Sequence, residues 1–378
     1  MPQPLLRLLH PLPPAEPLHL DETALSEIER RARTHNLLML VYVQLQKYHN
    51  EIPQSSTVDT YLKQRKTLFL SNAVHSVRQE AVEKEILQLL GSEQIPAIVI
   101  KGNEIAKEIY NDPNCRRSSD IDILIKMSDA LQVDTIFTKA GYPRIDKNPL
   151  GFWFSRLHHA QYFHPKNNDL IEMHWNFGIP SFFKLTSEDI WDEVTCNEAG
   201  HYKLSPDMMV ISLLVHHHMH AFRELKILVD VLWALHTYEN QIDWPAFAEK
   251  LEKIGLIKTT RITLGQIKGL WEDSAKQMQG LQALDQEITK IGYAEPAFLQ
   301  SYFKMDVETH GPFQNKKDIF VFRLALDRWP TILFSFAKSL VPFPESIKEL
   351  YEDPRNRTLP KNYVKFIKWR LQEWTRSP

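Results

Sequence analysis

The stretch Arg116-Arg-Ser-Ser-Asp-Ile-Asp-Ile-Leu-Ile125 passes from a polar loop into a segment in which polar and apolar residues alternate. This alternation predicts a β-strand with one face in the core, because successive side chains of a strand point to opposite faces. Asp120 and Asp122 then share the other face. Two carboxylates aimed at one place repel each other unless a cation lies between them, and Mg²⁺ is a natural partner for such oxygen ligands.

Two further predicted strands flank this one in the sequence. Ile171-Glu-Met-His-Trp175 offers Glu172 and His174 on one face, so three carboxylates converge if its strand neighbours the first. The apolar run 95–100 is typical of a buried strand and ends at Lys101-Gly102. The turn there opens a short helix, whose first N–H groups would face a phosphate together with the charge of Lys101.

Helical patterns surround this small unit. Residues 22–48 predict one helix and residues 56–91 a second one with Gly91 as its C-cap, and helical patterns resume after about Pro206. We therefore expect an α+β protein, in which a small mixed-sheet α/β core is embedded between N-terminal and C-terminal helical regions. The predicted boundaries give a helical region at 1–94, an α/β core at 95–204 and a helical domain at 205–378.

Composition narrows the class of protein and its partners. The chain has 378 residues, of which 43% are hydrophobic and 24% charged, as in ordinary globular proteins. With 45 Lys+Arg against 47 Asp+Glu there is no general basic field, so bulk nucleic acid is not an expected partner. Two cysteines make no disulfide framework, and neither a signal peptide nor a membrane span is evident. We expect a cytoplasmic protein.

An isolated Asp-x-Asp is more often a solvated strand end than a catalytic pair, but here it is combined with a turn glycine and a third acid on a later strand. This combination resembles the polymerase-β-like nucleotidyltransferase superfamily. More closely, the segments 100–110, 116–125 and 171–175 are similar to a bacterial branch of nucleotidyltransferase family proteins, whose genes often lie in peptide natural-product and polysaccharide clusters. The resemblance extends from about residue 35 onward.

The resemblance implies an enzyme that depends on Mg²⁺ (or Mn²⁺) and moves an NMP from an NTP such as ATP to an acceptor hydroxyl or phosphate, with release of pyrophosphate. The acceptor would be a peptide, a sugar or a phosphorylated small molecule. Asp120, Asp122 and Glu172 would be the catalytic and metal-binding acids, and Asp122→Ala is expected to abolish turnover with the fold intact. The nucleotide-binding residues would be Lys101, Gly102, Asn103, Arg116, Ser119, His174, His216 and His220.

Two features leave the interpretation open. Asn103 stands where the superfamily usually has serine, and the gap from this turn to Asp120 is longer than usual. A non-catalytic NTP-binding scaffold therefore remains an alternative, as does a toxin-like transferase acting on tRNA, although the near-neutral charge opposes the latter.

His216 and His220 lie one turn apart on a predicted helix, a spacing that suits a packing face, a substrate contact or a zinc site. The resembling family has a similar pair followed by an acid, here Asp230, which favours a role in lining the site. The basic, aromatic tail 355–378 is typical of a docking helix or, less often, of a helix on a membrane surface.

Overall fold

The computed structural model describes residues 4–14, 16–53, 55–146, 150–152, 154, 157–196, 202–292, 322–340, 361–362 and 364–368. The chain forms two compact units, Met1–Ala325 and Leu326–Pro378. In the second unit, α15 spans Trp329–Leu340 and has proline at its second position, where a missing N–H costs nothing. Most of the basic tail lies outside the described residues, and the domain boundaries predicted at 94 and 204 stay predictions.

A four-stranded mixed sheet forms the centre of the first unit, in the order β1-β2-β4-β3. The strands are β1 (Ala97–Val99), β2 (Asp120–Ile125), β3 (His159–Phe163) and β4 (Leu170–His174). β2 runs parallel to β4 and antiparallel to β1, and β3 runs antiparallel to β4. The α+β class and the predicted positions of β1, β2 and β4 are confirmed, although β1 is shorter than the apolar run that predicted it.

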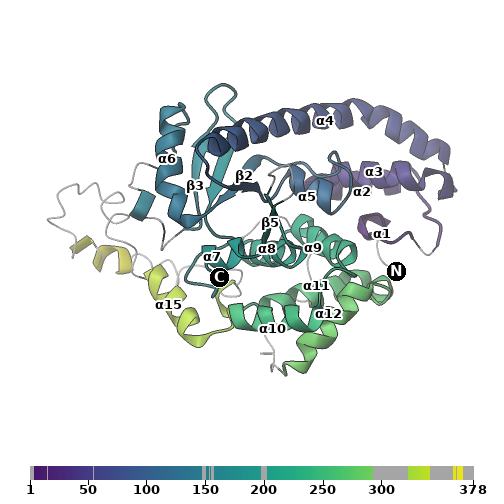
Figure 1. Cartoon of the computed structure of the whole chain (residues 1–378). Helices are drawn as coiled ribbons and strands as arrows, with labels where there is room; N and C mark the ends of the chain where they lie inside the picture. Colours follow the sequence, from purple (N-terminus) through teal and green to yellow (C-terminus); the bar gives the residue numbers. More distant parts are fainter. Residues whose placement is uncertain are drawn as a thin grey trace. The chain divides into compact units, whose positions relative to one another are not determined.

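Helix α4 (Ser55–Ser92) is 38 residues long and covers one face of the sheet with its C-terminal half (Figure 1). Val82, Ile86 and Leu90 pack into the core formed by the strands and by α6 (Ala130–Lys139). The burial of these apolar side chains holds the long helix against the sheet, at roughly 1.5–3 kcal/mol for each fully buried residue. Gly91 lies inside α4, so its prediction as a C-cap is wrong.

Three helices precede α4, and two of them lie between residues 22 and 48, where the sequence pattern predicted one. These are α1 (Pro4–Leu9), α2 (Glu22–Thr34) and α3 (Leu38–Tyr48). Asp21 caps α2 by accepting the Ala24 N–H, and the chain turns at Asn36, whose φ is +56°. Because asparagine tolerates this left-handed conformation better than most residues, one continuous helix is replaced by two.

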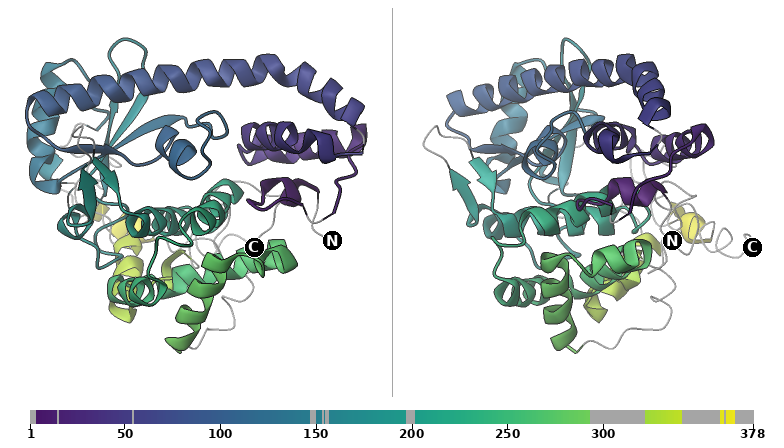
Figure 2. Two further views of the ribbon diagram at one scale, coloured as in Figure 1. Left: turned by 45° about the vertical axis from the view of Figure 1, so that its right-hand side comes forward. Right: turned by 90° about the vertical axis from the view of Figure 1, so that its right-hand side faces the viewer.

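The sheet lies between α4 and a helical layer built by the second half of the unit (Figure 2). Helix α8 is almost wholly buried, and its His217 and His218 are held by hydroxyls of Thr263 and Thr259 on α11. Along the chain between β4 and α8, the structure contains helix α7 and the hairpin β5–β6, which were not predicted. The bounds are α5 (Asn103–Glu108), α7 (Ser187–Trp191), β5 (Val194–Cys196), β6 (Tyr202–Leu204), α8 (Pro206–Met219), α9 (Leu225–Thr237), α10 (Trp244–Ile254), α11 (Ile257–Ala275) and α12 (Gln279–Lys290).

None of the helices in the described part of the chain is both long and apolar enough to cross a membrane.

Candidate functional site

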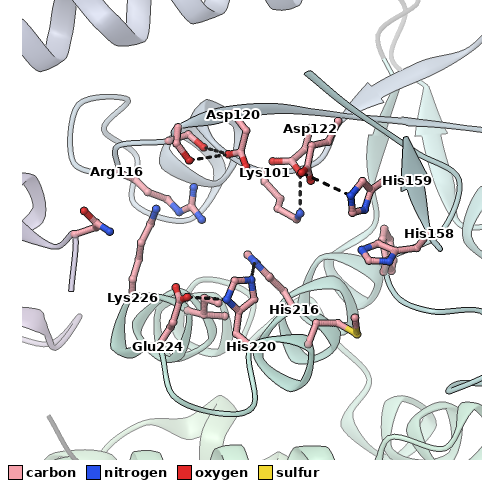
Figure 3. Close-up of a pocket in the computed structure, with 17 residues that line it drawn as sticks. Lys101, Arg116, Asp120, Asp122, His158, His159, His216, His220, Glu224 and Lys226 are labelled. Atoms are coloured by element: carbon pink, nitrogen blue, oxygen red, sulfur yellow. Dashed lines mark hydrogen bonds and ion pairs between the residues drawn. The ribbon is translucent and has the colours of Figure 1, made fainter. Parts of the chain in front are cut away.

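A cavity of about 460 Å³ opens between the polar end of the sheet and the helices α8 and α9. This volume falls within the range of small-molecule sites. Figure 3 shows Asp120, Asp122 and Lys101 on one wall and the α8 histidines on the wall opposite. Arg116 and Lys226 reach in from one side, and His158 and His159 from the other.

The three predicted acids come from two neighbouring strands. Asp120 and Asp122 lie on β2, Glu172 lies on β4, and Asp122 pairs in register with Glu172. Paired residues of adjacent strands are about 5 Å apart and point to the same face. The condition for the convergence of the acids, that their strands are neighbours, is therefore met, and all three acids line the cavity.

Asp122 is the most enclosed of the acids, with 2% of its side chain exposed. Its Oδ1 lies 2.7 Å from Lys101 Nζ and 2.8 Å from His174 Nε2. Burial alone would raise the pKa of this carboxyl, but Lys101 and His174 hold it well below its usual value. The contact with Asp122 in turn raises the pKa of Lys101, although burial of the ammonium opposes this rise. Asp122 is therefore ionised and held in place, because Lys101 and His174 both contact its carboxylate.

Glu172 and Asp120 flank this centre in different ways. Gln161 donates to Glu172 Oε1 at 2.8 Å, and His174 Nε2 lies 3.3 Å from Oε2. Although burial opposes it, His174 lowers the pKa of Glu172 to about 2. Asp120 accepts hydrogen bonds from the Ser118 and Ser119 hydroxyls, and its pKa is raised first by burial and then by Asp122 and Glu172.

The donor set fits a divalent cation. Asp122, Glu172 and His174 each offer a ligand atom, and these atoms lie within 4.8 Å of one another. Asp120 stands beside them with its pKa raised by the neighbouring anions, which means that negative charge is in excess there. A cation at this place would relieve that repulsion.

The turn after β1 is shaped by Gly102, which has φ +57° and begins α5. An added Cβ would stand 3.3 Å from Ser118 Cβ, so a larger residue is disfavoured on both counts. Asn103 does not face the cavity. Its buried amide donates instead to the Ser76 carbonyl and to Glu83 Oε1 on α4, at 3.2 and 3.1 Å. We therefore leave Asn103 out of the proposed nucleotide contacts.

The Asn103 contact leads to a prediction about stability. Burial of its carboxyl raises the pKa of Glu83 from 4.5 to about 7. The folded state thus disfavours the charged form, and the penalty is complete above pH 7 and disappears as the pH falls toward 4.5. Glu83→Gln keeps an acceptor for Asn103, so we expect it to raise the free energy of unfolding at pH 8 by up to about 3 kcal/mol.

Urea unfolding at pH 5 and pH 8 measures this effect, which should be small at pH 5. Glu80→Gln on the same helix is the control, because Lys84 and Lys107 lower the pKa of Glu80 and its charge is favourable. An equal gain for Glu83→Gln at both pH values would contradict the assignment.

Arg116 is 5% exposed and forms an ion pair with Asp230 on α9, which is wholly buried. Its Nε lies 3.1 Å from Asp230 Oδ2, and Tyr110 donates to Oδ1 of the same carboxylate at 2.7 Å. Among the described residues, its buried Nη1 has no hydrogen-bond partner. Because Arg116 also lines the cavity, one face of its guanidinium is fixed and a donor remains for a ligand.

Lys226 adds a second cation beside Arg116. Its Nζ donates to the Arg117 carbonyl at 2.8 Å. Burial, together with the nearby Arg116 charge, lowers the pKa of Lys226 to about 8. Asn36, at the turn between α2 and α3, also lines the cavity.

The opposite wall carries the predicted histidine pair. His216 Nε2 lies 3.1 Å from His220 Nε2, and Glu224 Oε1 holds His220 Nδ1 at 2.7 Å. Burial, followed by the charge of Lys101, keeps the pKa of His216 well below its usual value. Both histidines line the cavity, together with the apolar side chains of Phe177, Met219 and Ile227.

The structure brings together nearly all of the predicted site. Ser119 stands at the rim and His174 lies behind the acids, between Asp122 and Glu172. The sequence interpretation missed several lining residues, which reach the cavity only through the tertiary fold. The sequence does contain a local indication for Glu224, which follows His220 by one helical turn, and for His158 and His159, which are adjacent in the chain. Apart from Ser118, which is next to Ser119, the missed polar lining residues are Asn36, His158, His159, Glu224 and Lys226.

Residues 21–271 match a protein family described as an uncharacterised nucleotidyltransferase. No curated protein and no solved structure matches the chain significantly.

Proposed function

Because the chain belongs to this nucleotidyltransferase family, we propose that it transfers an NMP from an NTP to an acceptor hydroxyl or phosphate and releases pyrophosphate. One observation carries the proposal: Asp120, Asp122 and Glu172 converge on a cavity whose other end holds Arg116 and Lys226. Acids that suit a metal, next to cations that suit phosphates, are the arrangement that phosphoryl-group transfer needs.

Asp120, Asp122 and Glu172 would hold Mg²⁺ or Mn²⁺. When bound, such an ion neutralises phosphate oxygens and orients the reacting groups. Glu172 lines the cavity opposite Asp122, so it is placed to take the proton of an acceptor hydroxyl. The acceptor oxygen then bonds to the α-phosphorus as the bond to pyrophosphate breaks.

Arg116 and Lys226 would bind the phosphates. Arg116 has a spare donor at Nη1, and Asp230 and Tyr110 prevent the guanidinium from turning away. A guanidinium fixed in this way loses little side-chain entropy when it binds phosphate. His216 and His220, across the cavity, would contact the nucleoside or the acceptor, with His220 oriented by Glu224.

The test is to incubate the purified chain with each NTP and with Mg²⁺, Mn²⁺ or a chelator, and to supply an extract of small molecules as a source of acceptors. Pyrophosphate release that needs a divalent ion, with a nucleotide-sized mass gain on one compound, is the expected result. Metal-independent NTP binding without pyrophosphate release would favour the non-catalytic scaffold instead, and a mass gain on tRNA alone would favour the toxin-like reaction.

Lys226 makes the proposed phosphate contact sensitive to pH. Since its pKa is lowered to about 8, the ammonium loses its proton between pH 7.5 and 9.0. We expect a fluorescent ATP analogue, without metal, to bind roughly fivefold more weakly at pH 9.0 than at pH 7.5. Lys226→Met should bind more weakly at pH 7.5 and lose this pH dependence.

Lys203→Met is the matched control, because Lys203 pairs with Glu108 on the surface and lies outside the cavity. It should bind like the unaltered chain at both pH values. A pH dependence that persists in Lys226→Met would exclude Lys226 as its source.

A further inference from the structure

Three imidazoles meet at the end of the cavity away from Arg116. His159 on β3 pairs in register with His174 on β4, and the His158 carbonyl accepts the Trp175 N–H. The ring centroids are 4.5 Å apart for His158 and His159, and 5.0 Å apart for His159 and His174. The sheet backbone therefore fixes all three residues, as a preorganised binding site requires.

One ring nitrogen of each of the three histidines has no partner within the described fold. Nδ1 of His158, of His159 and of His174 is buried and has no hydrogen-bond partner in the described part of the chain. Buried polar atoms are normally paired, so an unpaired nitrogen on each of three neighbouring rings needs an explanation.

The surroundings resemble the outer shell of a metal site. His174 Nε2 lies 2.8 Å from Asp122 Oδ1, which leaves Nδ1 as the free nitrogen of this ring. Metal-binding histidines commonly give their other ring N–H to a carboxylate, which fixes the ring and raises its basicity. Glu172 lies 3.7 Å from His159 Nε2 and provides a second carboxylate at the same place.

We propose that His158, His159 and His174 form a binding site for a borderline transition-metal ion, with Zn²⁺ the best match. One ring nitrogen from each residue lies within 4.8 Å of the others. In a tetrahedral site with Zn–N bonds of about 2.1 Å the nitrogens are about 3.4 Å apart, a contraction that small side-chain rotations can supply. Imidazole ligands select Zn²⁺ over Mg²⁺, which prefers oxygen.

These three ligands differ from Asp120, Asp122 and Glu172, which would hold the metal of the proposed transfer reaction, although His174 also contacts Asp122 and Glu172. Three protein ligands leave a fourth position open, as in catalytic zinc sites. Since His158 and His159 line the cavity, that position would be accessible to an oxygen or nitrogen atom of a bound molecule. The inference goes beyond the proposed function and does not depend on it.

The test uses the full chain, stripped of metal with a chelator and titrated with Co²⁺ while the visible absorption is recorded. We expect one Co²⁺ per chain with the intense spectrum of a tetrahedral site, and displacement of Co²⁺ by Zn²⁺ but not by excess Mg²⁺. His158→Ala and His159→Ala should each weaken Zn²⁺ binding more than about 100-fold, because even outer-shell changes cost 10–100-fold. Circular dichroism checks the fold, and His159→Gln replaces any alanine variant that does not fold.

Three variants serve as controls. His164→Ala removes a buried histidine just after β3 that faces Glu85 rather than the cavity, and His220→Ala removes a cavity histidine from the opposite wall. Asp120→Asn alters the carboxylate site without touching the imidazole cluster. All three should bind Zn²⁺ like the unaltered chain.

Two results would overturn the proposal: no stoichiometric Co²⁺ or Zn²⁺ binding, or binding that His158→Ala and His159→Ala leave intact. Loss of binding in His220→Ala would also overturn it, by moving the site to α8. The outcome is separable from the transfer reaction, because zinc binding without pyrophosphate release sustains this inference alone, whereas Mg²⁺-dependent release without zinc binding sustains only the proposed function.

Discussion

Asp122→Asn is expected to lower the rate of NMP transfer by roughly 10³-fold or more while the protein stays folded. The estimate corresponds to the loss of one group that stabilises the transition state of a charged reaction. Asparagine keeps the shape of the side chain, but it lacks the charge that Lys101 and His174 contact at Oδ1. The measurement is the initial rate of pyrophosphate release at saturating NTP and Mg²⁺.

The alanine variant is a less clear test than the sequence alone suggests. Because Asp122 is 2% exposed and Lys101 19%, Asp122→Ala leaves a largely buried ammonium without its anion. Removing one partner of a buried pair costs about 3–5 kcal/mol. Of the two expectations for Asp122→Ala, loss of turnover and an intact fold, the second is therefore the weaker. Lys101→Met combined with Asp122→Asn should recover part of the stability that Asp122→Asn loses, and remain inactive.

Asp169→Asn is the matched control for activity. Asp169 precedes β4 and is paired with Arg78 at 2.6 Å, so the variant also removes one carboxylate charge and one ion pair beside the same sheet. It lies outside the cavity, and its rate should be unchanged. If Asp122→Asn keeps more than about a tenth of the normal rate, Asp122 is not a catalytic group.

The acidic half of the site follows from local rules. Alternation in residues 120–125 and 171–175 predicts strands and assigns each acid to a face, because the side-chain period of a strand is fixed. The parallel pairing of β2 with β4 then brings Asp122 opposite Glu172. Local rules did not predict the position of Asn103. Helix α4 passes beside the turn, and the Asn103 amide donates hydrogen bonds to it instead of facing the cavity.

Lys226 and Asn36 could not be predicted as site residues, because long-range contacts bring them to the cavity. Lys226 reaches the Arg117 carbonyl across 109 residues of sequence, and Thr237 donates to the Ile109 carbonyl across 128. Asn36 enters the cavity only because α2 and α3 break at that residue. Sequence periodicity contains no information about which of these helices meets the polar loop.

Helix α9 holds that loop through the ion pair between Asp230 and Arg116, and Asp230→Ala is expected to lower the free energy of unfolding by about 3–5 kcal/mol. The reason is that Arg116 keeps its charge in a buried place and loses the carboxylate that compensates it. Tyr110→Phe removes only the hydroxyl that donates to Asp230, and should cost about 1 kcal/mol. Urea unfolding near neutral pH measures both.

Two further variants separate this explanation from simple packing. Asp285→Asn breaks a surface pair with Lys268, in which the side chains are 30% and 46% exposed, and should change stability by less than about 1 kcal/mol. Arg116→Met combined with Asp230→Leu removes both buried charges, so we expect it to be clearly more stable than Asp230→Ala alone.

Asp230 should also matter for binding, as a positioning residue that acts through Arg116. The Tyr110→Phe variant keeps the ion pair and should bind NTP nearly normally, whereas Arg116→Met with Asp230→Leu should be stable but bind NTP weakly. If that double variant binds NTP as well as the unaltered chain, Arg116 is a structural cation and the phosphates must lie elsewhere. Stability and affinity therefore respond differently to the same pair, because the ion pair stabilises the fold on one side of the guanidinium while Nη1 remains available on the other.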